Sequence, residues 1–256
     1  MNRLFVLLVF LLCLENSAVW AEPTHLVLIG GGPRPAAALK QFVSWAGGAK
    51  AKILVIAWAS EEPQASYDAL AKDFSPFAPA SIAMAPSPPV AIEKFLDQLQ
   101  CATGVFFSGG DQRRIMDVLK NAKLKAALQN LYRKGVVFGG TSAGTAIMSC
   151  QMMTGDGDFT VIDGRKVDTR EGLCLLPGTI LDQHFLKRQR ENRLFGLVLE
   201  SPTLLGIGID EGTALLVTDN RTAEVQGESQ VMTVSASGKS TLNVKLLKAN
   251  ELFTLP

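Results

Sequence analysis

Stretches of apolar residues alternate along the chain with stretches of mixed polarity, and this alternation predicts repeated strand–helix units. Runs that are apolar throughout and bounded by glycine are typical of strands buried on both faces of a sheet. In one of the segments between them, Ile92, Phe95 and Leu99 fall on a single helical stripe. We expect strands at residues 25–29, 53–57, 105–107 and 136–138, and helices at residues 35–46, 63–74, 90–99, 111–120 and 123–133.

The pattern changes after about Leu205. Short β-rich stretches there are separated by the turn-forming pairs Asp219-Asn220 and Gly227-Glu228. Hairpins are therefore expected to close the sheet, with strands at Ile207 and at residues 214–218, 223–226 and 231–234. Because repeated strand–helix units place parallel strands under helices on both faces, the predicted fold class is α/β.

The first 21 residues have the layout of a cleaved secretory signal peptide. Arg3 gives a positive start, residues 4–14 carry no charge, and Ala21 is a small residue at the expected cleavage point. A retained membrane anchor is the alternative, but the apolar run is shorter than the roughly 20 residues of a transmembrane helix. A lipoprotein is disfavoured because leucines precede Cys13. We predict an exported protein, periplasmic or extracellular, whose residues 22–256 form one domain.

Composition excludes several classes of function. The sequence of 256 residues holds 25 Lys+Arg against 24 Asp+Glu, so it lacks the cationic excess with which proteins bind nucleic acid. Hydrophobic residues make up 47% and charged residues 19%, which indicates a packed core rather than disorder. Beyond the leader no apolar stretch is long enough to span a membrane, so we expect no membrane association after cleavage.

Cysteine and histidine are scarce, and their spacing predicts no metal site. The four cysteines form no C-x-x-C pair, and there are two histidines. Once Cys13 leaves with the leader, Cys101, Cys150 and Cys174 remain. An odd number leaves at least one free thiol. Buried structural thiols are the favoured interpretation, and a disulfide between two of the three stays open.

Glycine-bearing turns follow three of the expected strands. The turn at residues 30–35 lacks the third glycine of a dinucleotide-binding loop, because Pro35 occupies that place, and we interpret it as a tight turn. The second turn, Gly109-Gly110, is suited to presenting bare backbone N–H groups to a ligand. Asp111 directly after it either belongs to such a site or caps the next helix.

The third turn is the strongest local signal in the chain. Residues 140–144 read Gly-Thr-Ser-Ala-Gly, between a buried strand and a segment able to form a helix. In a G-x-S-x-G elbow the serine lies on a strained strand-to-helix turn, where side chains two residues away on either side would clash. The same turn directs the N–H of Ala143 at a developing oxyanion. We predict that Ser142 is a nucleophile rather than part of a plain turn.

A catalytic serine needs a base, and the two histidines decide which residue serves. His25 leads into the first strand, so His184 is the candidate imidazole. A carboxylate should orient that imidazole. Asp210 and Glu211 both follow an expected strand, at the edge where the sites of open α/β sheets gather. The residues alone do not choose between these two acids.

Four motifs taken together resemble the cyanophycinase family of serine peptidases, which is related to aspartyl dipeptidase. They are Ser-Gly-Gly-Asp-Gln at 108–112, Gly-Thr-Ser-Ala-Gly at 140–144, Asp-Gln-His-Phe at 182–185 and Gly-Ile-Asp-Glu at 208–211. The resemblance implies a three-layer α/β/α sandwich like that of class I glutamine amidotransferases, with a mostly parallel sheet. It also implies a triad of Ser142, His184 and Glu211, an oxyanion hole formed by Gly110 and Ala143, and no metal or cofactor.

The resemblance also implies a substrate pocket. Six polar side chains would bind substrate, namely Gln112, Asp182, Gln183, Arg188, Arg190 and Arg193. Arginine forks suit carboxylates, and cyanophycin is a poly-aspartate whose β-carboxyls carry arginines. A solvated helix face is the alternative for the arginines. Arg188 and Arg190 would lie on opposite sides of a straight helix, so at least one must lie in irregular backbone.

The chain departs from the family at two places. The turn at residues 30–35 lacks the acidic residue expected there, and Thr145 stands where a small alanine is usual. The first departure could reshape the pocket or a dimer face. Together with the expected signal peptide, the resemblance predicts an exported serine exopeptidase that hydrolyses cyanophycin to β-Asp-Arg dipeptides, with a homodimer as a candidate assembly. An isoaspartyl or aspartyl dipeptidase that never meets the polymer, and a catalytically silent binding protein of the same fold, are the alternatives.

Overall fold

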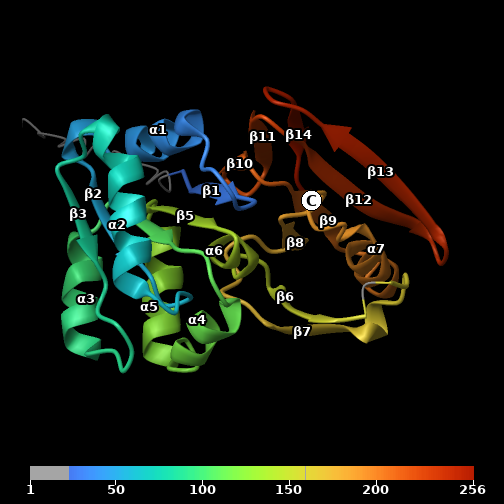
Figure 1. Ribbon diagram of the computed structural model, residues 1–256, viewed down its shortest axis with the longest axis horizontal. Helices are drawn as coiled ribbons and strands as arrows, with labels where there is room; N and C mark the ends of the chain where they lie inside the picture. Colours follow the sequence, from blue (N-terminus) through green and yellow to red (C-terminus); the bar gives the residue numbers. More distant parts are fainter. Residues whose placement is uncertain (1–22, 159) are drawn as a thin grey trace, which may run out of the picture.

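A mostly parallel sheet of eight strands forms the centre of the fold (Figure 1). The computed structural model describes residues 23–158 and 160–256, so the expected signal peptide lies outside the described residues. The neighbouring strands are β14 (Leu252–Thr254), β11 (Thr222–Gly227), β10 (Thr213–Thr218), β1 (His25–Ile29), β5 (Val137–Thr141), β4 (Gly104–Phe107), β2 (Lys52–Ile56) and β3 (Ser81–Met84). The neighbouring strands β1, β5, β4, β2 and β3 are parallel to one another. On the other side of β1, strands β10, β11 and β14 continue the sheet, each antiparallel to its neighbour.

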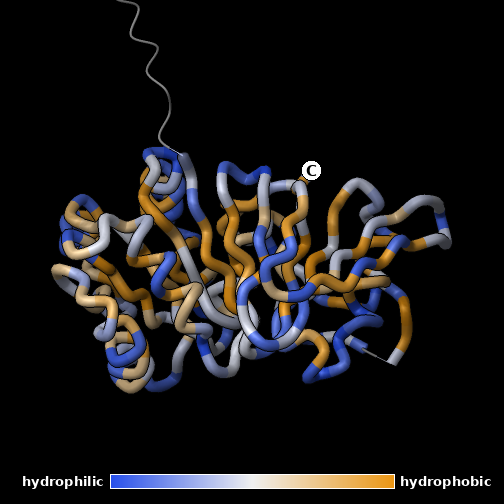
Figure 2. The backbone as a smooth tube through the Cα atoms, turned by 90° about the horizontal axis from the view of Figure 1, so that it is seen from above, coloured by the Kyte–Doolittle hydropathy of each residue, from blue (hydrophilic) through white to orange (hydrophobic). Residues whose placement is uncertain are grey.

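Alternate residues of each central strand enter two different cores, because successive side chains of a strand point to opposite faces. Leu26 and Leu28 of β1 enter one core, whereas Val27 and Ile29 enter the other. The helices of the first core are α3 (Ile92–Cys101), α4 (Gln112–Val118) and α5 (Ala122–Arg133), and those of the second are α1 (Ala36–Trp45) and α2 (Pro63–Phe74). Burial on both faces explains the unbroken apolar runs, which Figure 2 shows along the strands inside the molecule. The expected α/β/α sandwich is confirmed.

A second, smaller sheet lies beside the first and carries part of the site. Its strand order is β13 (Thr241–Leu247), β12 (Val231–Gly238), β9 (Leu205–Ile209) and β8 (Thr179–Gln183). Strands β8 and β9 are parallel, and helix α7 (Glu191–Glu200) packs on this sheet through Leu194 and Val198. The expectation that C-terminal hairpins close the sheet holds for β10 and β11, which join the main sheet, but not for β9 and β12, which belong to the second.

The remaining elements are short. A two-stranded ribbon of β6 (Gln151–Gly157) and β7 (Val167–Glu171) follows the small helix α6 (Ala143–Ala146). Single 3₁₀ turns lie at η1 (Gly48–Lys50), η2 (Ser75–Phe77) and η3 (Gly164–Lys166). None of the helices within the two described ranges combines the length and the apolar character that crossing a membrane requires.

The cysteines differ from the favoured interpretation. Cys150, before β6, and Cys174, after β7, form a disulfide with a Cα–Cα distance of 4.0 Å. Cys101, at the end of α3, is a free and exposed cysteine. The expectation of buried structural cysteines was wrong for Cys101, which is exposed, whereas the expected free thiol is present. The disulfide that the sequence left open joins the other two, because β6 and β7 pair and bring Cys150 and Cys174 together.

Candidate active site

Ser142 lies at the junction of β5 and α6, where the backbone turns too sharply for ordinary side chains. Its φ is 52° and its ψ is −110°, a conformation that non-glycine residues rarely adopt. A Cβ added to Gly140 would lie 2.4 Å from the backbone of Gly144, and one added to Gly144 would lie 2.5 Å from the carbonyl oxygen of Phe107. Both flanking positions therefore require glycine, and the turn has the geometry of a nucleophile elbow.

Three side chains form a continuous row from this elbow. The Oγ of Ser142 is 2.8 Å from Nε2 of His184, and Nδ1 of His184 is 2.5 Å from Oε1 of Glu211. His184 directly follows β8, and Glu211 follows β9, so the two residues leave the same edge of adjacent parallel strands. This arrangement has the order of contacts found in nucleophile–base–carboxylate triads.

Asp210, the other candidate acid, has a different role. Its Oδ1 accepts a hydrogen bond of 2.9 Å from the N–H of Lys187, and its Oδ2 accepts one of 2.7 Å from the hydroxyl of Ser229. Its carboxylate thus supports the turn that follows His184. The acid in contact with the imidazole is Glu211.

The environment of His184 favours the neutral imidazole. Burial lowers the pKa of His184 below its usual value of 6.5, because the charged ring loses hydration. The hydrogen bond to Glu211 opposes this effect, while the nearby cations Arg188 and Arg190 add to it. A neutral imidazole at neutral pH is the form that accepts a proton from the hydroxyl of Ser142.

The hydroxyl of Thr145 joins the elbow to the first strand. Its Oγ1 lies 2.7 Å from the carbonyl oxygen of Ile29 and 2.9 Å from that of Gly140, and the residue is fully buried. Ile29 is the last residue of β1, and Gly140 belongs to β5. In the sequence, Thr145 was only a departure from the family. The structure shows that its hydroxyl contacts two carbonyl oxygens, and an alanine would make neither contact.

The Gly109-Gly110 turn and the start of α6 flank Ser142, and they carry the two N–H groups that were expected to form an oxyanion hole. The Gly109-Gly110 turn approaches the serine, since a Cβ on Gly109 would lie 3.4 Å from that of Ser142. Gly110 has a φ of 135°, and Ala143 is the first residue of α6. A helix start and a glycine turn both expose N–H groups that no preceding turn of backbone satisfies.

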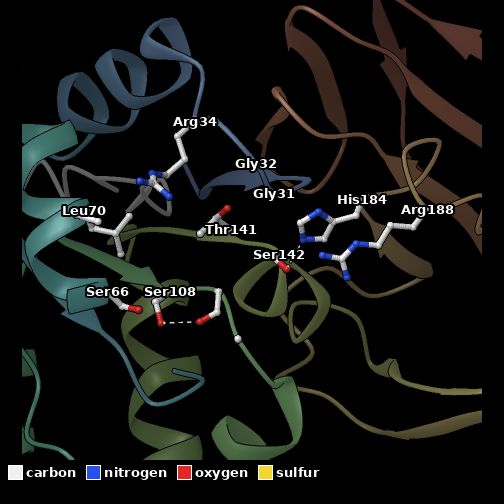
Figure 3. A pocket seen from close by; sticks show the side chains of 13 residues that line it. Gly31, Gly32, Arg34, Ser66, Leu70, Ser108, Thr141, Ser142, His184 and Arg188 are labelled. Carbon is white, nitrogen blue, oxygen red and sulfur yellow. Dashed lines mark hydrogen bonds between the residues drawn. The ribbon is translucent and has the colours of Figure 1, made fainter. Parts of the chain in front are cut away.

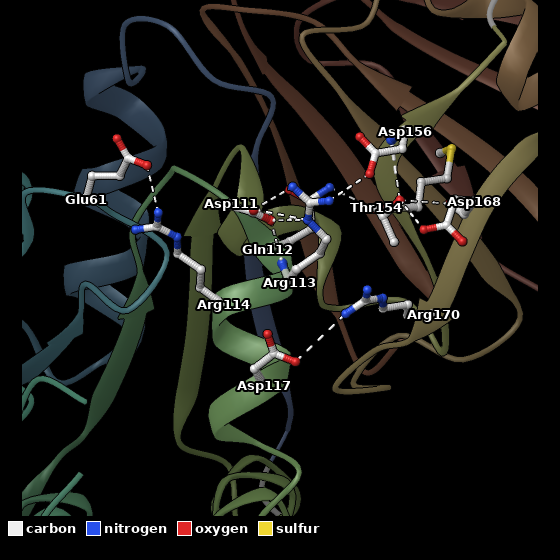
Figure 4. Close-up of polar contacts among 11 residues, drawn as sticks. Glu61, Asp111, Gln112, Arg113, Arg114, Asp117, Thr154, Asp156, Asp168 and Arg170 are labelled. Atoms are coloured by element: carbon white, nitrogen blue, oxygen red, sulfur yellow. Dashed lines mark hydrogen bonds and ion pairs between the residues drawn. The ribbon is translucent and has the colours of Figure 1, made fainter. Parts of the chain in front are cut away.

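Asp111 holds the Gly109-Gly110 turn through a cap and an ion pair (Figure 4). Its carboxylate accepts from the N–H of Arg113 at 2.8 Å, which caps α4, and also binds the guanidinium of Arg113. This hydrogen bonding lowers the pKa of Asp111 below its usual value. Arg113 continues to Asp156 of β6 at 2.7 Å. The capping role is thus the one that Asp111 has.

A pocket of about 370 Å³ opens in front of Ser142 (Figure 3). Its walls come from the turn after β1, from α2, from the turn after β4 and from the segment after β8. The lining residues are Gly31, Gly32, Arg34, Ser66, Ala69, Leu70, Ser108, Gly109, Gly110, Thr141, Ser142, His184 and Arg188. Figure 3 shows Arg34 and Arg188 on opposite sides of Ser142. The pocket therefore contains the candidate nucleophile and base between two cations.

Of the six side chains that the family resemblance assigned to substrate, Arg188 lines this pocket. Four of the others, Asp182, Gln183, Arg190 and Arg193, form a mostly buried polar network next to His184, and Gln112 is buried separately. Gln183 accepts from Nη1 of Arg190 at 3.0 Å and lies 3.4 Å from Oγ of Ser142. Arg188 and Arg190 both precede α7, in irregular backbone, with Arg190 as its N-cap residue.

Asp182 and Arg193 form the centre of that network. Their side chains are 0% and 1% exposed, and the Nε of Arg193 donates to Oδ2 of Asp182 at 2.7 Å. Gln112 is also buried, and its amide donates to the carbonyl oxygen of Met153 at 2.8 Å. Burial lowers the pKa of the neighbouring Arg190 to about 10. The network fixes the backbone on which Gln183 and His184 lie.

The sequence reasoning missed Arg34 as a pocket residue. It showed only that the turn after the first strand lacks the expected acid. The position of Arg34 in the sequence could have indicated its role, because a charged residue just beyond the carboxyl end of a parallel strand lies at the edge where the sites of α/β sheets gather. For a metal, residues 23–158 and 160–256 offer no group of three or more His, Cys, Asp or Glu side chains in a suitable arrangement.

Comparison with known proteins agrees with this geometry. Residues 26–225 match the profile of Peptidase family S51. The cyanophycinase of Trichormus variabilis is 31% identical over 249 residues, which are 94% of this chain and 84% of the relative. That of Synechococcus elongatus is 33% identical over 217 residues, 83% of this chain and 67% of the relative. The crystal structure of a peptidase from an acI-B1 Actinobacterium shares the fold, with a TM-score of 0.72 at 22% identity, covering 92% of this chain and 98% of that one. The chain therefore belongs to peptidase family S51 and is a serine-type peptidase similar to the cyanophycinases.

Proposed function

We propose that this protein is an exported serine exopeptidase that hydrolyses cyanophycin to β-Asp-Arg dipeptides. The observation that carries the proposal is the hydrogen-bonded row Ser142–His184–Glu211, whose first two members line an open pocket. The choice of cyanophycin as the substrate rests on the relatives named cyanophycinase, whose sequences align with 94% and 83% of this chain.

The chemistry follows from the positions of the groups. His184 removes the proton of the Ser142 hydroxyl as Oγ attacks the scissile carbonyl carbon. The N–H groups of Gly110 and Ala143 stabilise the oxyanion of the tetrahedral intermediate. Collapse breaks the C–N bond, and His184 donates its proton to the leaving amine. Water then attacks the acyl-serine with His184 again as base, which releases the acid product and restores Ser142. Glu211 holds the imidazole in the tautomer that has its free nitrogen toward the serine.

Two observations support export. Residues 1–21 have the composition and order of a signal peptide. The Cys150–Cys174 disulfide is typical of proteins that reside in an oxidising compartment. The destination, a periplasm or the medium, and assembly as a homodimer stay predictions, which cell fractionation and sedimentation of the purified protein check.

The proposal is tested with purified protein on cyanophycin granules, with products identified by mass spectrometry. The wild type is expected to release β-Asp-Arg, and Ser142→Ala to reduce the rate by about 10⁴-fold or more while remaining folded. Ser66→Ala is the matched control, because its hydroxyl lines the same pocket and bonds to Ser60 rather than to the histidine.

The alternatives give different results. Full activity on β-aspartyl dipeptides with none on granules would indicate a dipeptidase. Absence of turnover on both, together with failure of a fluorophosphonate to label Ser142, would indicate a binding protein and overturn the proposal.

A further inference from the structure

The pocket in front of Ser142 is lined by charges of one sign. Among the lining residues within the described ranges, Arg34 and Arg188 carry full charges and no carboxylate is present. The candidate for binding a cation, Asp182, is buried against Arg193 instead. Resting on the proposed function, we infer that Arg34 is a specificity-determining residue that binds a carboxylate of the substrate, across Ser142 from Arg188.

The backbone holds Arg34 in place. Pro33 and Pro35 flank it, and a residue that precedes proline is restricted to extended conformations. Pro35 has a φ of −58° and directly precedes α1, so the segment is anchored at its far end by a helix. At its near end the Gly31-Gly32 turn contacts His184 and Glu211. The backbone of residues 31–35 is thus restricted at both ends, by the contact with His184 and Glu211 and by the start of α1, and Arg34 lies within it.

The side chain of Arg34 is oriented by one ion pair. Its Nε donates to Oδ2 of Asp73 on α2, and the two side chains are 22% and 32% exposed. Within the described residues, Arg34 contacts Asp73 through Nε alone. The two Nη groups of its guanidinium therefore remain for another acceptor. Because the two Nη groups of an arginine match the two oxygens of a carboxylate, a fork held by its Nε is prepared for bidentate binding.

The carboxylate of Asp73 does not change the positive charge of the pocket lining. It is absent from the lining, whereas Arg34 is part of it. A ligand in the pocket therefore meets guanidinium groups on two sides and the partial positive charges of the Gly110 and Ala143 N–H groups between them. An anion is favoured in this field, and a guanidinium is disfavoured.

The chemistry of the substrate identifies that anion. In cyanophycin, an arginine joined through its α-amino group to a β-carboxyl keeps its own α-carboxylate. The C-terminal unit has a second carboxylate, at the end of the aspartate backbone. An exopeptidase that releases this unit needs to distinguish a free terminal carboxylate from a continuing amide. Arg34 supplies such a group at the pocket wall, while the guanidinium of the branch extends away from the two arginines.

The test compares two β-Asp-Arg-terminated peptides, one with a free carboxylate at the end of its aspartate backbone and one with that carboxylate amidated. The wild type is expected to prefer the acid. Arg34→Gln should raise KM for the acid about 10- to 100-fold and remove most of the preference over the amide, because one charged hydrogen-bond partner is lost. Lys72→Gln is the matched control: it removes the same charge from α2 at an exposed residue next to Asp73, outside the pocket, and should retain the preference.

An equal loss on acid and amide would show that Arg34 is structural and would overturn the inference. Should the glutamine variant fail to fold, Arg34→Lys keeps the charge near Asp73 without the fork, and a smaller but acid-selective rise in KM is expected. A second measurement separates this inference from the proposed function. Protection of Ser142 from fluorophosphonate labelling by the acid, and not by the amide, requires no peptide hydrolysis and should be lost in Arg34→Gln. Equal protection by both peptides would contradict the inference even if neither is cleaved.

Discussion

The α-carbon of Gly31 lies directly against the imidazole of His184. A Cβ at this position would be 2.3 Å from Cε1 and 2.5 Å from Nε2 of the ring, well inside van der Waals contact. The N–H of His184 also donates to the carbonyl oxygen of Gly30 at 2.7 Å. The turn after the first strand, which its sequence predicts only to be tight, therefore fixes both the backbone and the ring of the candidate base.

Replacing Gly31 by alanine should displace the imidazole. We expect Gly31→Ala to lower kcat about 100-fold or more, because small misplacement of a catalytic group is costly. Its φ of 112° adds backbone strain of about 1–3 kcal/mol. Gly48→Ala is the control, since Gly48 also has a positive φ, of 60°, but a Cβ added there would have nothing within 4 Å. A Gly48→Ala variant that loses stability without losing kcat, beside a Gly31→Ala variant that loses both, would agree with the geometry.

Glu211 and Asp210 are adjacent carboxylates with separable roles. Glu211→Gln should reduce kcat by about 10³- to 10⁴-fold, because the amide no longer stabilises the imidazolium or selects its tautomer. Asp210→Asn should mainly lower the free energy of unfolding, by about 1–3 kcal/mol, since it weakens the bonds to Lys187 and Ser229. Single-turnover kinetics and urea unfolding of both variants check this. Equal losses of kcat would contradict the assignment.

Much of the fold could be predicted because the central strands are buried on both faces. After their first residue, β1, β2 and β4 consist of buried apolar residues, and β5 begins with Val137 and Phe138, which is the pattern that identified them. β3 was missed because it is a half-exposed edge strand. β8 was missed for a different reason: its last residues, Asp182 and Gln183, are polar yet buried, and their burial depends on Arg190 and Arg193, which lie beyond the strand.

The site divides in the same way. The local signal of the elbow and the scarcity of histidine were enough to select Ser142 and His184. Glu211 needed the family resemblance, because both acids follow the same strand and only their side-chain directions differ. For Arg34 the sequence indicated only a position near the edge of the sheet where sites gather, since its place in the pocket depends on the contact of the turn after β1 with α2. Long-range contacts of this kind leave no periodic pattern in the sequence.

The pH dependence of the reaction should reflect the lowered pKa of His184. The neutral imidazole is the active form, so a pKa below 6.5 keeps it populated as pH falls and places the acidic limb of kcat/KM below pH 6.5. Arg188→Gln removes a cation that lowers this pKa, and the limb should move to higher pH. The measurement uses an uncharged activated ester, which makes no contact that depends on a substrate carboxylate. Lys187→Gln, an exposed cation in the same turn, is the control and should leave the limb where it is.

Asp111 and Asn121 both cap helices, but only Asp111 lies beside the site. Asn121 accepts from the N–H groups of Lys123 and Leu124 at the start of α5. Either substitution by alanine should cost about 1 kcal/mol of unfolding free energy, the usual effect of losing an N-cap. Only Asp111→Ala should also lower kcat, because the Gly109-Gly110 turn loses its anchor to Arg113. Urea unfolding and ester hydrolysis of the two variants test this, and an unchanged kcat in Asp111→Ala would show that the turn holds itself.

The buried pair Asp182–Arg193 provides the clearest distinction between a residue that binds substrate and one that supports the site. Both side chains are almost fully buried, and Oδ1 of Asp182 also accepts from the N–H of Gln183 at 2.8 Å, next to His184. Arg193→Met leaves a buried carboxylate without its main partner and should cost about 3–5 kcal/mol of unfolding free energy.

The double variant Asp182→Leu/Arg193→Met removes both charges and should recover much of that stability, since a buried ion pair is often replaceable by apolar side chains. If the pair acts by positioning His184, Arg193→Met lowers activity on granules, on β-aspartyl dipeptides and on a small ester by similar factors. If instead the pair binds substrate, as the family resemblance implied, the loss is confined to the peptides and the ester rate is retained. The burial of both side chains, together with their bond to the backbone beside the base, leads us to expect the uniform loss.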